Sequence, residues 1–237
     1  MCILITGAGK GIGKAIAIEF AKKLQPNRET KLFLTSRTES DLISVKKICE
    51  SYGAEVDYLV SDLSTTNAAK ATFNIAINRF QQINCLVNNA GVGRFKSLFE
   101  LTEDDYNFTM DTNLKATFFL TQLVFQSMQS AKNGHIFFIT SIAAEKPFEQ
   151  SALYCMSKFG QKGFVEVLRL YAQKCNVRIT NVMPGAVFTP MWGEEGIRNE
   201  QRMMMPEDIA EPIVQAYYLP TRTSIEEIVL RPIAGDL

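Results

Sequence analysis

The sequence predicts an α/β protein built on one doubly wound parallel sheet of about seven strands. Short apolar runs alternate with longer amphipathic stretches, which is the order of strands and helices that such a sheet requires. Several runs, such as Ile136–Ile139, are apolar at every position, as expected of strands covered on both faces. Because chains of 237 residues with 46% apolar content often fold as one unit, we expect a single domain over residues 1–237.

The apolar runs give the order of the strands, and helices fill most of the gaps between them. The first helix is expected at Lys14–Lys23, and the connections should be right-handed. The stretch Pro184–Met205 has no clear periodicity, so we predict a long loop there, with a substrate lid at about residues 185–205. The strands are predicted at Cys2–Thr6, Lys31–Ser36, Glu55–Ser61, Asn84–Asn88, Gly134–Ser141, Val177–Met183 and Glu226–Arg231.

Charge and cysteine usage exclude several classes of function. Twenty-five Lys and Arg residues balance twenty-five Asp and Glu residues, so we expect neither a nucleic-acid nor a membrane partner. Five cysteines without a CxxC pair indicate a reduced, cytoplasmic protein without a metal site. No apolar run is long enough for a signal peptide or a membrane span. His135, the only histidine, begins a predicted strand and is expected at the surface.

A glycine-rich turn follows the first strand and leads into an Ala- and Ile-rich helix. Glycine permits tight turns and close approach of the backbone to a pyrophosphate, and a helix N-terminus offers free N–H groups to phosphates. A plain tight connection is the simpler interpretation, but the flanking strand and helix favour a dinucleotide site. The residues predicted to bind the cofactor here are Gly7, Gly9, Lys10, Gly11, Ile12 and Gly13.

The end of the second strand indicates which dinucleotide binds. An acidic residue there would hold a ribose 2′-hydroxyl, but this strand ends in Ser36 and Arg37. Together with Lys10, Arg37 is suited to clamp a 2′-phosphate, so the cofactor is predicted to be NADP(H). In the alternative, Arg37 is only a solvated residue and Glu39 or Asp41 holds the ribose.

Three side chains form a candidate catalytic set. Tyr154 and Lys158 are four residues apart and therefore lie on one face of a helix. A lysine held there is expected to lower the pKa of the phenol and make it a usable acid. Ser141 ends a predicted strand at the edge of the sheet where α/β proteins bind ligands, and its hydroxyl is suited to hold a substrate oxygen.

The glycine turn and the candidate catalytic set resemble the motifs of the short-chain dehydrogenase/reductase family, and so do Asn88–Gly91, Asn113 and Pro184-Gly185. The motifs follow one another in the same order as in that family and extend over nearly the whole chain. The resemblance implies a Rossmann-type fold and carbonyl reduction with Tyr154 as the acid. It also implies that Ser141 orients the carbonyl oxygen, Lys158 holds the nicotinamide ribose, and Asn113 anchors a proton-relay water. Further cofactor contacts implied by the family are Asp62, Leu63, Asn89, Ala90, Gly91, Tyr154, Pro184, Gly185, Val187 and Thr189.

Each implied contact has a purely structural alternative. Asn88–Gly91 is also explained as the exit from a strand, Asn113 as a mid-helix residue satisfied locally, and Asp62 as the cap of the next helix. The family also suggests a homodimer or tetramer through the helices around Asn113 and Tyr154.

The substrate pocket carries a narrower resemblance. The segments around Phe95 and Trp192, and the tail ending in Gly-Asp-Leu, are similar to bacterial sepiapterin reductases, a group within this family. Aromatic rings can sandwich a pterin, and Asp236 can accept two hydrogen bonds from it. We therefore expect reduction of a side-chain ketone on a pterin. The alternatives are reduction of another carbonyl, such as a 3-oxoacyl thioester, and a non-catalytic NADPH-binding regulator.

Overall fold

The computed structural model describes residues 1–23 and 29–235 and contains one all-parallel sheet in the order β3-β2-β1-β4-β5-β6-β7. The predicted fold class is confirmed. The strands are β1 (Cys2–Thr6), β2 (Lys31–Ser36), β3 (Glu55–Val60), β4 (Cys85–Asn88), β5 (Gly134–Ile139), β6 (Val177–Pro184) and β7 (Glu227–Leu230). The helices are α1 (Gly11–Lys22), α2 (Glu39–Ser51), α3 (Thr66–Phe80), α4 (Glu103–Met110), α5 (Thr117–Ala131), α6 (Ala152–Ala172), α7 (Gly193–Asn199) and α8 (Pro206–Tyr218).

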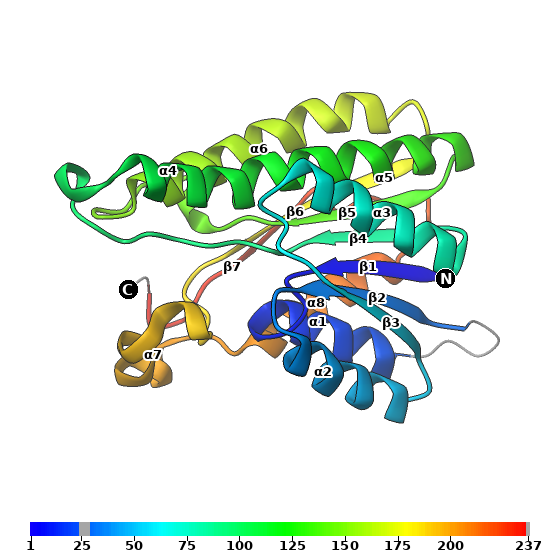
Figure 1. Cartoon of the computed structure of the whole chain (residues 1–237), viewed down its shortest axis with the longest axis horizontal. Helices are drawn as coiled ribbons and strands as arrows, with labels where there is room; N and C mark the ends of the chain where they lie inside the picture. The colour runs from blue at the N-terminus through cyan, green and yellow to red at the C-terminus, as the bar shows by residue number, and fades with distance from the viewer. Residues whose placement is uncertain (24–28, 236–237) are drawn as a thin grey trace.

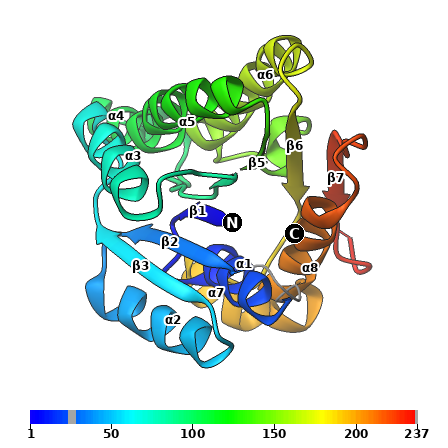
Figure 2. The same ribbon diagram turned by 90° about the vertical axis from the view of Figure 1, so that its right-hand side faces the viewer.

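Helices cover both faces of the sheet, as Figures 1 and 2 show. On one face α1, α2 and α8 bury side chains such as Phe20, Leu42 and Ile213 against the strands. On the other face α3, α5 and α6 do the same with residues such as Ala76 and Val124. Burial on both sides explains why the strands are continuously apolar, and removal of this surface from water drives the layers together.

The lid segment is more regular than predicted. The sequence suggested a loop over Pro184–Met205, but the structure has short 3-10 turns at Pro190–Trp192 and Glu200–Arg202 on either side of α7. An isolated parallel bridge between Val187 and Met204 joins the two ends of this segment. α7 and α4 lie beyond the same end of the sheet, at the left of Figure 1.

His135 is buried, and the prediction of a surface position was wrong. It is 0% exposed, because β5 is a central strand and Tyr217 of α8 packs nearby. Its Nε2 is 2.8 Å from the Thr180 hydroxyl, and its ring stacks on Phe137. Burial lowers the pKa of His135 well below its usual value, so the ring is neutral at pH 7.

Other predictions concern cysteines, metals and membranes. All five cysteines are buried free thiols. Within residues 1–23 and 29–235, no three His, Cys, Asp or Glu side chains are grouped as metal ligands. None of the helices in this part of the chain has the length and apolar character needed to cross a bilayer.

Candidate active site

The glycine turn between β1 and α1 packs tightly against the loop that follows β4. Gly7 has a φ of +64°, and a Cβ there would lie 2.9 Å from Ala90 Cα. A Cβ on Gly13 would lie 2.4 Å from the Gly7 carbonyl oxygen. The Asn89 amide donates to the Thr6 and Gly7 carbonyls at 2.9 and 3.1 Å. Asn89 therefore braces the turn, and only glycine fits at positions 7 and 13.

The outer part of the turn contacts two other predicted cofactor residues. A Cβ on Gly9 would lie 2.8 Å from Ser36 Oγ, and a Cβ on Gly11 would lie 3.1 Å from Thr189. Helix α1 begins at Gly11, its N-cap residue Lys10 makes no side-chain cap, and the described residues of its first turn include no acid. The N–H groups at this end therefore remain suited to an anion.

The two basic residues predicted to clamp a 2′-phosphate lie beside this turn, and one of them is paired with a carboxylate. Arg37 is exposed directly after β2, and Lys10 Nζ lies 3.2 Å from an Asp41 carboxylate oxygen. Asp41 belongs to the first turn of α2, where a negative charge also favours the helix dipole. The structure thus brings Lys10, Ser36 and Arg37 to one end of the sheet.

Asp62 and Leu63 follow β3 on the same edge of the sheet. Asp62 is exposed, and its Oδ1 accepts a hydrogen bond from Ser64 N at 3.0 Å. The cap of α3 is instead Thr65, whose side chain accepts from Ala68 N. Leu63 is buried. The Asp62 carboxylate therefore does not cap α3, and it remains at the surface.

The predicted catalytic residues lie together on α6 and just beyond β5. β5 ends at Ile139, so Ser141 stands two residues past the strand instead of at its end. The Ser141 hydroxyl lies 3.5 Å from the Pro184 carbonyl oxygen and accepts from Ala143 N, and it acts to lower the pKa of Tyr154. Lys158 Nζ lies 5.5 Å from the centre of the Tyr154 ring.

Burial shifts the pKa values of both Tyr154 and Lys158 on α6. It raises the pKa of Tyr154 to about 12, against a smaller lowering by the Ser141 hydrogen bond. The pKa of Tyr154 is therefore not lowered overall, contrary to the expectation drawn from its spacing to Lys158, because desolvation dominates. Burial also lowers the pKa of Lys158, which is 3% exposed, to about 7. At neutral pH Tyr154 keeps its proton, whereas the pKa of Lys158 lies near that pH.

Lys158 is held by two neutral acceptors. Its Nζ donates to the Ile139 carbonyl at 2.9 Å and to Gln161 Oε1 at 3.1 Å. Gly91 lies next to this group, since a Cβ there would be 3.6 Å from the ammonium nitrogen. The ammonium is therefore fixed beside the loop that follows β4.

Asn113 lies in a π-helical turn, Asp111–Ala116, between α4 and α5. Its side chain exchanges two hydrogen bonds with the Val92 backbone, at 2.8 and 2.9 Å, and donates to Ser157 Oγ at 2.9 Å. The Asn113 carbonyl accepts from Gln161 Nε2 at 2.8 Å. The side chain of Asn113 therefore links the loop after β4 to α6, and its carbonyl faces the region around Lys158.

Phe95 packs beside the Tyr154 ring in a tilted arrangement. Its ring centre is 5.6 Å from that of Tyr154, and a Cβ on Gly93 would touch it at 2.6 Å. Arg94 and Lys96, on either side of Phe95 in the chain, both pair with the buried carboxylate of Asp105, at 3.4 and 2.8 Å. These two ion pairs anchor the loop on both sides of Phe95.

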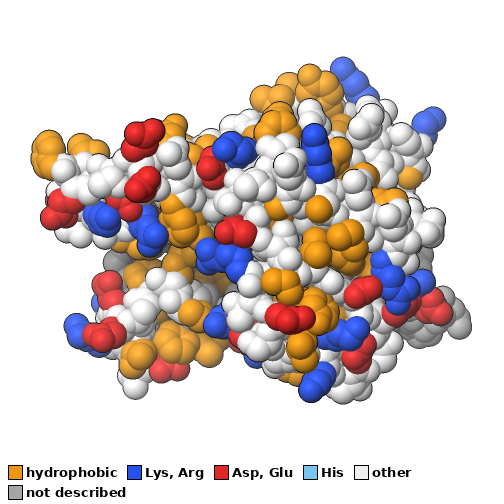
Figure 3. Space-filling view, viewed as in Figure 1, with side chains coloured by type: hydrophobic (Ala, Val, Ile, Leu, Met, Phe, Trp, Pro, Cys, Tyr) orange, Lys and Arg blue, Asp and Glu red, His pale blue; other side chains and the backbone are white. Residues whose placement is uncertain are grey.

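Trp192 belongs to the segment predicted to form the lid. It ends the 3-10 turn before α7, and Gly196 packs against it, since a Cβ there would be 2.8 Å from Trp192 Cβ. Figure 3 shows this face of the molecule hollowed between the α4 and α7 segments, with hydrophobic and basic side chains on the walls. Asp236 lies outside the described residues.

The segment after β6 lies next to Ser141 and next to the glycine turn. Pro184 ends β6 beside Ser141, and Gly185 N donates to the Leu230 carbonyl. A Cβ on Gly185 would lie 3.0 Å from Pro232. Val187 is buried at the base of the lid.

Sequence reasoning missed Gln161, Ser157 and Asp105. Gln161 and Ser157 flank Lys158 on α6, so their helical spacing from Tyr154 and Lys158 was the available signal. Asp105 was detectable only as the third residue after Thr102, with which it forms a capping box. Its pairing with Arg94 and Lys96 depends on the fold of the intervening loop.

Comparison with known proteins agrees with this geometry. The family model for short chain dehydrogenase matches residues 1–200. The chain belongs to the short-chain dehydrogenase/reductase family. The resemblance drawn from the glycine turn, Ser141, Tyr154 and Lys158 is therefore confirmed, and the protein is an oxidoreductase of this family.

Individual short-chain dehydrogenase/reductases match nearly the whole chain. A sepiapterin reductase of Chlorobaculum tepidum is 56% identical over 99% of this chain and 97% of that protein. An uncharacterised oxidoreductase of Staphylococcus saprophyticus is 31% identical over 97% of this chain and 96% of that protein. The structure of an alcohol dehydrogenase from the archaeon Thermococcus sibiricus, complexed with 5-hydroxy-NADP, superposes with a TM-score of 0.91 at 26% identity, covering 100% of this chain and 98% of that one.

Proposed function

We propose that this protein is an NADPH-dependent sepiapterin reductase, which reduces the side-chain ketone of a pterin. The observation that carries the proposal is the 56% identity with the Chlorobaculum tepidum enzyme over 99% of this chain, together with an aromatic ring on the catalytic phenol. The matched region extends over the predicted lid segment and the loop after β4 as well as the family motifs.

The residues at the glycine turn fit NADP(H). Side chains at Gly9 and Gly13 would collide with their surroundings, so bare backbone faces this region. The uncapped start of α1 suits the pyrophosphate, and Lys10 with Arg37 suits a 2′-phosphate. A structural neighbour from a metagenome, 28% identical with a TM-score of 0.85, is in complex with NADP. Asp62, Asn89–Gly91, Val187 and Thr189 are proposed to line the rest of the cofactor site.

Tyr154 is the proposed proton donor. Its phenol is protonated at neutral pH because burial raises its pKa to about 12. Reduced nicotinamide supplies a hydride when it is bound. The hydride adds to the carbonyl carbon, the π electron pair of the C=O bond moves onto the oxygen, and Tyr154 gives its proton to that oxygen, which the Ser141 hydroxyl holds. The Lys158 ammonium stabilises the phenolate that remains.

Phe95 and Trp192 are proposed to hold the pterin ring. Phe95 is 51% exposed and its ring lies 5.6 Å from that of Tyr154, so a flat substrate stacked there has its side chain close to the proton donor. Stacking of this kind contributes about 0.5–1.5 kcal/mol per ring pair beyond area burial. Asp236 is proposed as a further anchor for the pterin.

Incubation with NADPH and a panel of carbonyl compounds tests the proposal. The panel contains sepiapterin, small diketones and 3-oxoacyl thioesters, and absorbance of the reduced nicotinamide reports turnover. We expect the highest kcat/KM with sepiapterin, and a clear preference for NADPH over NADH. Ready reduction of diketones or oxoacyl compounds with sepiapterin untouched would refute the pterin assignment and leave another carbonyl reductase.

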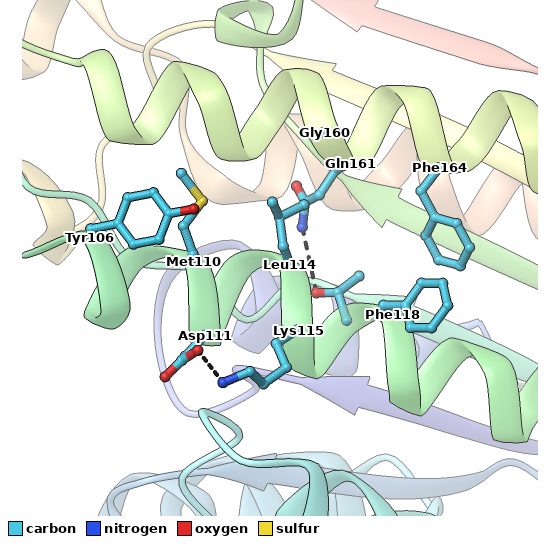
Figure 4. Close-up of a pocket in the computed structure, with 10 residues that line it drawn as sticks. Tyr106, Met110, Asp111, Leu114, Lys115, Phe118, Gly160, Gln161 and Phe164 are labelled. Atoms are coloured by element: carbon cyan, nitrogen blue, oxygen red, sulfur yellow. Dashed lines mark hydrogen bonds and ion pairs between the residues drawn. The ribbon is translucent and has the colours of Figure 1, made fainter. Parts of the chain in front are cut away.

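We also propose that a second copy of the chain covers the face formed by α4, α5 and α6. A groove of about 510 Å³ runs there between Tyr106, Leu114 and Phe118 on one side and Gly160 and Phe164 on the other (Figure 4). Phe118 is 42% exposed although it is apolar. Light scattering on the purified protein should give a mass of at least two chains.

A further inference from the structure

We infer that Gln161 is a positioning residue that sets the charge and place of the Lys158 ammonium. The inference deepens the proposed reaction, because Lys158 acts on the phenol that donates the proton. Gln161 is 2% exposed, and it lies one turn after Lys158 on α6. Figure 4 shows its side chain pointing from α6 towards the helix that carries Leu114 and Phe118.

Both ends of the Gln161 amide have partners that fix its orientation. Nε2 donates to the Asn113 carbonyl at 2.8 Å, and a carbonyl oxygen can only accept. Oε1 accepts from Lys158 Nζ at 3.1 Å, and an ammonium can only donate. The amide therefore cannot flip without losing both bonds. The Asn113 carbonyl, in the π-helical turn, holds the amide nitrogen, and this fixes the amide oxygen towards Lys158.

The hydrogen bond to Gln161 stabilises the positive charge of Lys158, which burial disfavours. The described partners of the ammonium are the Ile139 carbonyl and Gln161, both neutral, and no carboxylate shares them. A hydrogen-bond acceptor favours the protonated amine, so loss of the Gln161 oxygen should lower the pKa of Lys158 further. A carboxylate at the same place should raise it.

Gln161 contacts the residue that the family resemblance assigns to a proton-relay water, since the Asn113 carbonyl accepts from its Nε2. An amide does not titrate, so it transmits no proton to or from Lys158 under ordinary conditions. The role of Gln161 is therefore to hold the ammonium and not to carry its proton.

Few charged groups face Lys158. Tyr154 lies against it from α6, with a pKa raised to about 12, so it stays neutral below pH 10. From β5 the neighbour is the Ile139 carbonyl, from the π-helical turn the Asn113 side chain and carbonyl, and from the loop after β4 the backbone of Gly91. A change in protonation between pH 5.5 and 8.5 at this place therefore belongs to Lys158.

Two opposite substitutions test the inference. In the protein without cofactor, Gln161→Leu should shift the protonation midpoint of Lys158 by about one pH unit downwards, and Gln161→Glu by about one unit upwards. The midpoint is measured as the pH at which the unfolding free energy begins to rise, with Gln122→Leu, an exposed glutamine of α5, as the matched control. The pH profile of kcat should move in the same two directions.

Equal midpoints in native protein, Gln161→Leu and Gln161→Glu would overturn the inference, even if both variants lose activity. Loss of stability without a shift would likewise assign Gln161 a packing role only. Gln161→Met serves in place of Gln161→Leu if the latter does not fold. Because the unfolding measurement needs no substrate, opposite shifts in a protein that reduces no carbonyl would leave this inference standing and refute the proposed reaction.

Discussion

Lys158→Met should remove a pH dependence of stability that burial of the ammonium creates. The pKa of Lys158 is about 7 in the folded protein, against an ordinary value of 10.5 for a solvated lysine. Between these values the unfolded chain binds more protons, so the unfolding free energy rises with pH by up to about 1.4 kcal/mol per unit. Integration from pH 7.0 to 8.5 gives about 1.5 kcal/mol for this one group. Below pH 7 both states bind the proton, and the dependence fades.

The assay is urea unfolding of the cofactor-free protein at fixed concentration, at pH 7.0, 7.75 and 8.5. Native protein should gain about 1.5 kcal/mol relative to Lys158→Met across this range. Lys162→Met, a partly exposed lysine on the same helix, serves as the control and should follow the native curve. This range lies below pH 9, where the buried thiols of Cys2 and Cys49 would begin to oppose the trend, since their pKa values are raised. Parallel curves for native protein and Lys158→Met would refute the reasoning.

Two further predictions concern recognition. Arg37→Ala should narrow the preference for NADPH over NADH by about 5- to 100-fold, as expected for loss of a charge-assisted hydrogen bond, and calorimetric titration measures it. Arg222→Ala, another exposed arginine, should leave the preference intact, whereas equal affinities in native protein would contradict the cofactor assignment. Trp192→Ala should raise KM for sepiapterin more than for a small diketone, and Trp192→Phe should restore most of the difference. An equal rise for both substrates would argue against stacking on Trp192.

The strands were predictable because both faces of the sheet are buried. Cys2–Thr6 and Lys31–Ser36 were placed at their observed bounds, since each apolar run begins and ends with the strand. The strands predicted to begin at Asn84 and to end at Ser141 were one and two residues too long. Backbone hydrogen bonds to the neighbouring strand continue past the strand ends, from Asn84 N to the Cys2 carbonyl and from Thr140 N to the Val182 carbonyl. His135 was misplaced because one residue cannot reveal which strand lies at the centre of the sheet.

The site was predictable where chemistry imposes a fixed spacing. A helix requires the spacing between Tyr154 and Lys158, and a tight turn requires the spacing between the glycines, so both arrangements can be predicted from the sequence. Gln161 was not predicted, because its role depends on the Asn113 carbonyl, 48 residues away, reaching α6. The raised pKa of Tyr154 was also missed, since desolvation is a property of the packed molecule.

Tyr154→Phe tests the central claim most directly. The substitution removes the proton donor and keeps the ring that packs against Phe95. In a reaction with saturating NADPH and sepiapterin, followed by nicotinamide absorbance, kcat should fall by at least about 100-fold. NADPH affinity, measured separately by fluorescence titration, should stay within about three-fold of the native value, because the phenol hydroxyl is the only one of the proposed cofactor contacts that is lost. A variant that retains more than a tenth of native turnover would contradict the assignment of Tyr154 as the acid.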